Sequence, residues 1–406
     1  MEAHPARTLS RQQRTQLVGL AALIFVILAS YAMARPATES LFLSHYSTDH
    51  LPWLWILVGA GSLAVVTVYN RYAATTDLVR IFGAVSGLSA ACLSLLLFGL
   101  SSETPWLTWV LYLWKDLYIV VLIEIFWSFA NSTVPEQRAK WWYGLFCVIG
   151  SLGGMAGNLA IGWLADVFST QSSLWAVVAM LAASGVGAWA LARATHIEAA
   201  PSSVKRRLSD GFQVLKGSPL LWVLMALIGT SQVVITLVDY QFTTAVAANF
   251  PEEAERTKVF GQVYAAIDLS AITLQLATGP ILRVLGVGGV LLAIPGLLAM
   301  SVLGFALVPR FAAIAVGKVA SKAFDYSLFR AAKEIVYIPL SHAERTQGKA
   351  FVDMMAYRMA KAGTSALLLG LLALGKPQLA LWVTIACLIL WIWLTTQLKQ
   401  RQGPRT

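Results

Sequence analysis

Long apolar stretches, separated by short polar segments, fill most of the chain. Many of these stretches reach about 20 residues, the length that a helix needs to cross the hydrocarbon core of a bilayer. Helices are the expected spanning form, because lipid offers no partner to an exposed backbone group. The pattern predicts twelve transmembrane helices, over residues 16–37, 51–70, 80–100, 105–131, 139–163, 172–192, 219–242, 258–282, 287–308, 311–330, 350–374 and 378–398.

The widest polar segment in mid-chain separates six predicted spans from six and contains the basic run VKRR. An all-α integral membrane protein with two six-helix halves has the architecture of the major facilitator superfamily. The loop after the second span lacks the usual G-x-x-x-D-R signature of that superfamily and reads NRYAATTDLVR. The predicted parts are a cytoplasmic N-terminal tail (1–15), an N-terminal six-helix bundle (16–192), a basic cytoplasmic linker (193–218), a C-terminal six-helix bundle (219–398) and a cytoplasmic C-terminal tail (399–406).

Composition and charge support a membrane protein. Hydrophobic residues make up 58% of the chain and charged residues 12%, about half the charged share of a soluble protein. The net charge of +10 fits cytoplasmic loops better than a nucleic-acid partner, because Lys and Arg collect in such loops. On the opposite side the twelve-span count leaves only Arg256, Lys258, Arg310 and Lys376. We therefore predict a multi-pass protein of a bacterial inner membrane with both termini in the cytoplasm.

The first apolar stretch has some features of a signal peptide. Arg11 and Arg14 precede it, and Ala32-Met33-Ala34 resembles a cleavage site. We expect the segment to be retained, because the twelve-span topology needs it as the first helix.

Motifs for catalysis or metal binding are not found in the sequence. Cys92, Cys147 and Cys387 all lie in apolar stretches and form no disulfide framework or metal-ligand pattern. Neither a P-loop nor a constellation around a nucleophile occurs. We expect a protein that is not an enzyme and uses no cofactor or metal.

Ionisable residues inside the predicted spans are the main functional signal, since each costs a few kcal/mol at bilayer depth. They gather in spans one, four, seven and ten, the helices that line the central cavity of a major-facilitator fold. Asp116 and Glu124 lie about 80° apart around one helix, and Lys318, Lys322 and Asp325 form an i, i+4, i+7 stripe. Such charges fit an anionic substrate with a polar head group. Structural salt bridges between helices are the alternative interpretation.

Several motifs resemble the ATP/ADP translocase family of plastids and obligate intracellular bacteria. The chain reads SKAFDYSLFRAAKEIVYIPL at 321–340, where the family reads roughly S-K-x-x-K-Y-S-L-F-D-x-x-K-E-x-x-Y-I-P-L. GKAFVD and KAG follow, as G-K-A-x-x-D and K-S/A-G do in the family. FWSFAN at 126–131, YQF at 240–242 and FGQVYAAIDLSAITLQL at 260–276 extend the resemblance through both halves.

The resemblance implies nucleotide transport: exchange of ATP for ADP, import of nucleotides with protons, or carriage of related nucleotides. It also implies roles for charged residues that bind phosphates and base. Asp116 matches a glutamate of the family pattern, and Arg35 matches the arginine of L-R-D at the end of span one. Further matched positions are Lys333, Glu334, Lys349, Asp353 and Lys361.

Two departures from the family pattern concern its charges. The lysine of L-R-D-x-K-D-x-L is Thr38 in this chain. In span ten, the family's K-Y-S-L-F-D has become Asp325 to Arg330, so the signs at its two ends are exchanged. An exchange that keeps both signs points to an ion pair or gate, and the loss of basic residues argues against a triphosphate.

The sequence therefore favours a secondary transporter that moves a nucleotide or related phosphorylated anion by alternating access. Alternatives are a proton-coupled carrier of a less charged metabolite, or a membrane scaffold or sensor that transports nothing. The predicted substrate-binding residues are Arg35, Lys115 and Lys322, with Arg358 and Lys361 as second choices. The predicted coupling or gate residues are Asp116, Glu124, Asp239, Asp325, Arg330 and Glu334.

Overall fold

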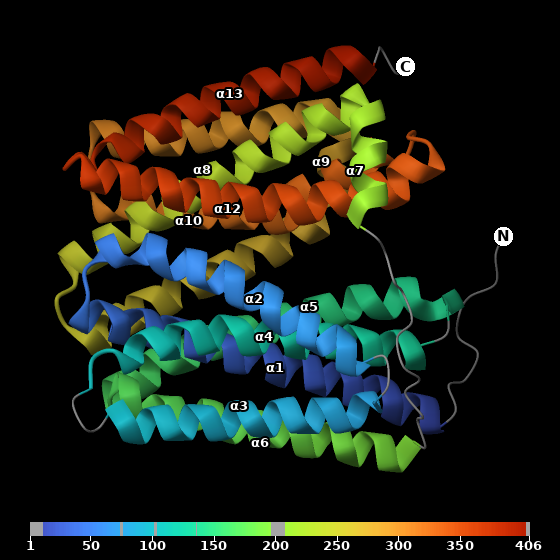
Figure 1. Cartoon of the computed structure of the whole chain (residues 1–406), viewed down its shortest axis with the longest axis vertical. Coiled ribbons are helices and arrows are strands. Elements are labelled where there is room, and N and C mark those ends of the chain that lie inside the picture. Colours follow the sequence, from blue (N-terminus) through green and yellow to red (C-terminus); the bar gives the residue numbers. More distant parts are fainter. Residues whose placement is uncertain (1–10, 74–75, 101–103, 135, 196–207, 403–406) are drawn as a thin grey trace. The chain divides into compact units, whose positions relative to one another are not determined.

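The computed structural model describes residues 11–73, 76–100, 104–134, 136–195 and 208–402. All regular elements in these ranges are helical (Figure 1). The predicted tails and the predicted linker lie partly outside the described residues. The helices are α1 (Arg11–His45), α2 (Leu51–Ala73), α3 (Leu78–Leu100), α4 (Leu107–Thr133), α5 (Glu136–Val167), α6 (Thr170–Thr195), α7 (Leu208–Gly217), α8 (Pro219–Asn249), α9 (Glu253–Leu307), α10 (Phe311–Phe324), α11 (Arg330–Tyr337), α12 (Lys349–Ala373) and α13 (Leu379–Gln402), with short helical turns η1 (Thr48–His50), η2 (Asp325–Phe329) and η3 (Glu344–Gly348).

The chain divides into two compact units. Unit 1 takes its described residues from 1–45, 60–204 and 252–265. Unit 2 takes its described residues from 46–59, 205–251 and 266–406. The division crosses two helices, so the start of α9 belongs to unit 1 and the start of α2 to unit 2.

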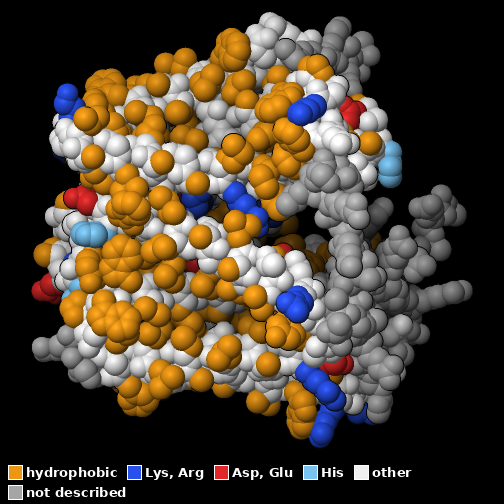
Figure 2. All heavy atoms as spheres, viewed as in Figure 1, with side chains coloured by type: hydrophobic (Ala, Val, Ile, Leu, Met, Phe, Trp, Pro, Cys, Tyr) orange, Lys and Arg blue, Asp and Glu red, His pale blue; other side chains and the backbone are white. Residues whose placement is uncertain are grey.

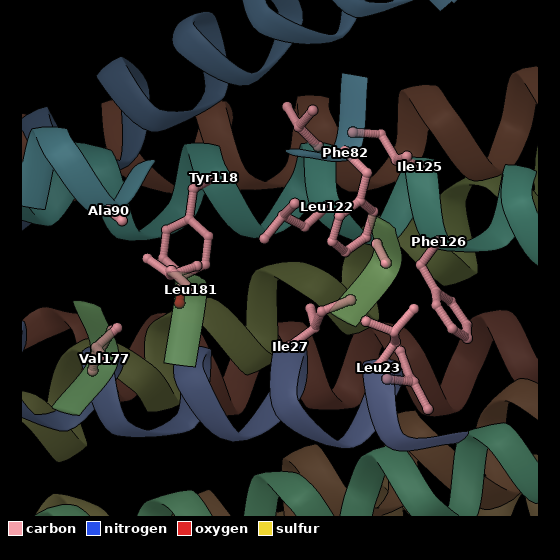
Figure 3. Packing of buried hydrophobic residues seen from close by; sticks show 14 of the residues in the cluster. Leu23, Ile27, Phe82, Ala90, Tyr118, Leu122, Ile125, Phe126, Val177 and Leu181 are labelled. Carbon is pink, nitrogen blue, oxygen red and sulfur yellow. The ribbon is translucent and has the colours of Figure 1, made fainter. Parts of the chain in front are cut away.

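In unit 1, α1 packs against α4, α5 and α6, and α3 packs against α4 and α6. Their facing side chains form one hydrophobic cluster, in which Ile27, Leu122 and Leu181 are completely buried (Figure 3). The α1–α5 contact depends on small residues. A Cβ at Gly153 or Gly157 would overlap backbone atoms of α1, so these glycines let the two helices approach closely.

Unit 2 is built around α8, which packs against α10, α12 and α13. The helix labelled α9 contains a break at Gly286, where φ is 65° and ψ is 168°. A positive φ is available to glycine at little cost because it has no Cβ. The predicted spans 258–282 and 287–308 lie on either side of this break.

The charged stretch of span ten contains an irregular turn. α10, η2 and α11 follow one another without interruption from Phe311 to Tyr337, and η2 is a turn of π-helix. Single π-turns inside α-helices are frequent at functional sites. This one begins at Asp325, the residue at which the family pattern has a lysine.

Among the described residues, eight helices are long and apolar enough to cross a membrane. Seven of them hold one predicted span each, and α9 holds two. The predicted spans outside this set are 105–131, 311–330 and 350–374, all of which carry several charges. A multi-pass, all-helical protein is therefore confirmed, and the count of twelve spans stays a prediction. Hydrophobic side chains cover much of the face seen in Figure 2, as lipid contact requires.

Candidate functional site

Within unit 1, Arg35 contacts the side chains of Glu39 and Tyr264. Its Nε lies 3.2 Å from Oε1 of Glu39, one helical turn further along α1. Its guanidinium carbon lies 4.0 Å from the ring centre of Tyr264, at the start of α9, where a cation is attracted by the ring face. The Tyr264 hydroxyl donates a hydrogen bond to the second Glu39 oxygen. Glu39 and Tyr264 are only 6% and 4% exposed, so they fix the orientation of Arg35.

Glu39 and Tyr264 did not emerge from the sequence as site residues. The i, i+4 spacing from Arg35 to Glu39 on one helix was the feature of the sequence that could have indicated this ion pair. Tyr264 lies 225 residues from Glu39, and only the packing of α9 on α1 brings the two side chains together.

Other side chains of residues 252–265 also bond to the rest of unit 1. The buried Arg256 donates a hydrogen bond of 2.6 Å to Oγ of Ser44, near the end of α1. Lys258 forms an ion pair with Asp166, near the end of α5. The first turns of α9 are thus attached to α1 and α5 by charged and polar contacts, and Tyr264 adds its contacts to Arg35 and Glu39.

On α4, Lys115 is paired with its neighbour in the chain. The ammonium lies 3.0 Å from Oδ2 of Asp116 and 3.8 Å from the ring centre of Tyr112, and only 1% of Lys115 is exposed. The hydroxyl of Tyr31 donates to the other Asp116 oxygen at 3.1 Å. Glu124, two turns further along α4, is exposed.

In unit 2, Asp239 on α8 contacts two lysines of α10. It forms an ion pair with Lys318 and lies 3.4 Å from the ammonium of Lys322. The two lysines differ in exposure: the side chain of Lys318 is 1% exposed and that of Lys322 is 16% exposed. Since they are one turn apart on the same helix face, the carboxylate compensates two like charges. Asp325 faces α8 as well, where the side-chain amide of Gln232 donates to it at 3.1 Å.

Two charged residues of α11 pair with residues of α12. Lys333 lies 2.9 Å from Oδ1 of Asp353, and Glu334 forms an ion pair with Lys349. Glu334 therefore has a partner on another element, although its i, i+4 neighbour Arg330 is equally available in the sequence. Arg330 and Glu334 are both exposed.

The second-choice residues Arg358 and Lys361 lie one turn apart on α12. Arg358 is partly exposed and Lys361 is exposed. Tyr357, beside them in the chain, has its ring centre 5.6 Å from the Lys333 ammonium. This ring links the middle of α12 to the Lys333–Asp353 pair.

The three predicted anion contacts share one property: each has a carboxylate in direct contact. The partner of Arg35 is Glu39, that of Lys115 is Asp116, and that of Lys322 is Asp239. Breaking a buried ion pair is costly unless another group compensates the charge that remains. A phosphate or carboxylate group of a ligand would compensate it with charge-assisted hydrogen bonds. Chemically, the sites are therefore suited to exchanging one anionic partner for another.

Comparison with solved structures defines the class of fold. The structure resembles a variant of the nucleoside transporter NupG with a TM-score of 0.70, at 11% identity, over 95% of this chain and 99% of that one. It also resembles a bacterial homologue of the iron transporter ferroportin with a TM-score of 0.69, at 11% identity, over 97% and 99% of the two chains. Likeness at such low identity concerns the fold alone, so the chain shares the fold of these two proteins.

The family follows from the sequence comparisons. Residues 99–314 and 301–402 match the model of the TLC ATP/ADP transporter family. The chain therefore belongs to this family, which confirms the resemblance found in the motifs.

Named relatives agree with the family assignment. The chain is 26% identical over 342 residues to ADP,ATP carrier protein 1 of Chlamydia trachomatis, covering 72% of this chain and 65% of the relative. It is 27% identical over 306 residues to the plastidic ATP/ADP-transporter of Solanum tuberosum, covering 64% and 47%. The match to ADP,ATP carrier protein 3 of Rickettsia bellii is 24% over 357 residues, covering 73% and 71%. The aligned part of this chain thus spans just under two thirds of the Chlamydia carrier and about half of the plant transporter.

Proposed function

We propose that the protein is a secondary transporter that moves a nucleotide across a bilayer by alternating access, in exchange for a second nucleotide. The observation that carries the proposal is family membership together with basic residues in the helices of both units, each in contact with a carboxylate. The carriers of Chlamydia, Rickettsia and Solanum that the chain resembles are named for ATP and ADP. The fold likeness to membrane transporters supports alternating access.

In this proposal the substrate phosphates replace carboxylates as partners of the basic residues. Lys322 is the first candidate, because its side chain is partly exposed and its contact with Asp239 is longer than that of Lys318. Lys318 keeps the Asp239 charge compensated when Lys322 changes partner. A phosphate can then bind without leaving the partly buried Asp239 carboxylate alone, which would be costly.

Arg35 and Lys115 are the corresponding candidates in unit 1. Glu39 holds Arg35 until a substrate anion competes for the guanidinium, and Asp116 does the same for Lys115. Arg358 and Lys361 remain second choices for anion contact. Asp116, Glu124, Asp239, Asp325, Arg330 and Glu334 remain the proposed coupling or gate residues.

Uptake by proteoliposomes tests the proposal. Purified protein is reconstituted into vesicles that contain ADP or no nucleotide, and entry of labelled ATP is followed. Exchange predicts rapid entry only into vesicles that contain ADP. Transport of an unrelated anion with no binding or entry of any nucleotide would contradict the proposed function.

The variant Lys322→Ala tests the proposed anion contact. We expect at least about a tenfold loss of uptake, because hydrogen bonds to charged groups contribute about 1.5–3 kcal/mol. Lys376→Ala is a matched control, since it removes the same charge from an exposed position between α12 and α13. Unchanged uptake in a well-folded Lys322→Ala protein would remove Lys322 from the binding site.

Proton-coupled transport of a less charged metabolite is the second candidate. Thr38 replaces a lysine of the family pattern, and Asp325 and Arg330 exchange the signs of another pair. Entry into nucleotide-free vesicles that depends on a pH gradient would favour this mechanism over exchange.

We further propose that the membrane is a bacterial inner membrane and that both chain ends lie in the cytoplasm. The distribution of Lys and Arg among the predicted loops supports this orientation. Labelling of single cysteines, introduced near each end of a variant in which Cys92, Cys147 and Cys387 are replaced by Ser, tests it in inverted and right-side-out vesicles.

A further inference from the structure

An apolar groove lies on unit 1 between α2, α3 and α4. Its volume is about 830 Å³, within the range of about 300–1,000 Å³ that is typical of small-molecule sites. Its lining is almost entirely hydrocarbon and includes Val65, Leu88, Leu117 and Val121. Leu88 is 72% exposed, so the groove opens to the surroundings of the unit.

The length of the groove matches one leaflet of a membrane. On α3 the lining residues extend from Arg80 to Cys92, about 18 Å at 1.5 Å per residue. The hydrocarbon core of a bilayer is about 30 Å thick, so half of it is about 15 Å. A single acyl chain that enters from one surface of the membrane would extend along most of the groove.

Polar groups collect at one end of the groove. Arg80 lies in the first turn of α3, and Tyr72 and Thr76 lie at and just beyond the end of α2; all three line the groove. Asp77, the acidic neighbour, accepts hydrogen bonds from the backbone N–H groups of Val79 and Arg80 at 2.8 and 3.0 Å. Its carboxylate therefore caps α3, and Arg80 gives the end of the groove a positive charge beside two hydroxyl groups.

We propose that this groove binds one acyl chain of an anionic phospholipid and that Arg80 holds the lipid phosphate. The apolar lining excludes a water-soluble anion as the main occupant, because such a ligand would leave most of the groove without a partner. The charged end lies on the side that the sequence predicts to be cytoplasmic, and the cytoplasmic leaflet carries anionic lipids. A guanidinium pairs with phosphate oxygens through two parallel hydrogen bonds. The site is separate from the charged pairs proposed for transport.

Native mass spectrometry of the full chain in detergent tests the proposal. The protein is titrated with phosphatidylglycerol and with phosphatidylcholine of the same acyl chains. We expect one phosphatidylglycerol to bind about tenfold more tightly, because phosphatidylcholine carries a quaternary ammonium beside its phosphate, and this positive charge would be repelled by Arg80. Equal affinity for the two lipids in the unmodified protein would overturn the proposal, and this comparison requires no variant.

Two pairs of variants locate the site. Arg80→Gln should abolish the preference for phosphatidylglycerol, whereas Arg71→Gln should keep it, because Arg71 is an exposed residue near the end of α2 that does not line the groove. Ala84→Trp should fill the groove and prevent binding, whereas Ala91→Trp, on the same helix but outside the lining, should not. If the two variants of either pair lost lipid preference or lipid binding equally, the assignment of the lipid site to this groove would be overturned.

Discussion

Two buried ammonium groups, Lys115 in unit 1 and Lys318 in unit 2, are compensated in different ways. Both are 1% exposed. The partner of Lys115 is the next residue of the same helix. The partner of Lys318 is Asp239, 79 residues away on α8, which also contacts Lys322. The first ion pair lies within one helix, whereas the second links α8 to α10. A ligand anion at Lys322 would therefore act on a contact between helices.

The variant Asp239→Asn should show the largest difference between the two arrangements. It leaves two lysines one turn apart without their shared carboxylate, and one of them is buried. Because an uncompensated buried charge costs about 3–5 kcal/mol, we expect a large drop in the unfolding temperature in detergent, measured by scanning fluorimetry. Asp116→Asn should cost less, because it removes the carboxylate partner of one lysine, whereas Asp239 is the partner of two.

A second substitution separates charge from packing at Asp239. If the loss of stability arises from the buried Lys318 ammonium, the double variant with Asp239→Asn and Lys318→Met should unfold at a higher temperature than the single variant Asp239→Asn. Equal instability of the single and double variants would show that the carboxylate stabilises unit 2 in another way.

Removal of one hydroxyl group sharpens the comparison within unit 1. Tyr264→Phe leaves the buried Glu39 with one donor fewer, which costs about 1–3 kcal/mol for a buried group. Tyr31→Phe removes the hydrogen bond from α1 to the more exposed Asp116, and the cost should be smaller. Guanidinium denaturation or thermal unfolding measures both. A larger effect of Tyr31→Phe would mean that Asp116 depends on α1 more than Glu39 depends on α9.

The smallest effect is expected outside the predicted spans, at Glu344. Hydrogen bonds from Ser218 and Ser341 hold the pKa of its carboxyl below the usual range. A lowered folded pKa contributes stability that is complete above the unfolded pKa and is lost as pH falls through the folded pKa. We expect Glu344→Gln to reduce the unfolding temperature slightly at neutral pH, and the difference from the unmodified protein to shrink on acidification. A difference that stays constant with pH would exclude a charge effect.

The sequence predicted the helical class, the family and the helices that carry buried charge. The hydropathy of each stretch is a local property, so eight of the helices could be recognised from length and composition. Charges lowered the apolarity of α4, α10 and α12, and the same charges marked these helices as functional candidates. The break at Gly286 falls between two predicted spans, so α9 consists of two helices that meet at this residue.

What the sequence by itself determined was which charged residues lie in apolar helices, together with the motifs of the TLC ATP/ADP transporter family. Only the tertiary structure decided which partner each charge has. Glu39 contacts Tyr264 and Asp239 contacts Lys318 because particular helices pack at a particular rotation. Glu334 pairs with Lys349 for the same reason. An ion pair requires contact within a few ångströms, and helix packing brings residues that are far apart in the chain to that distance.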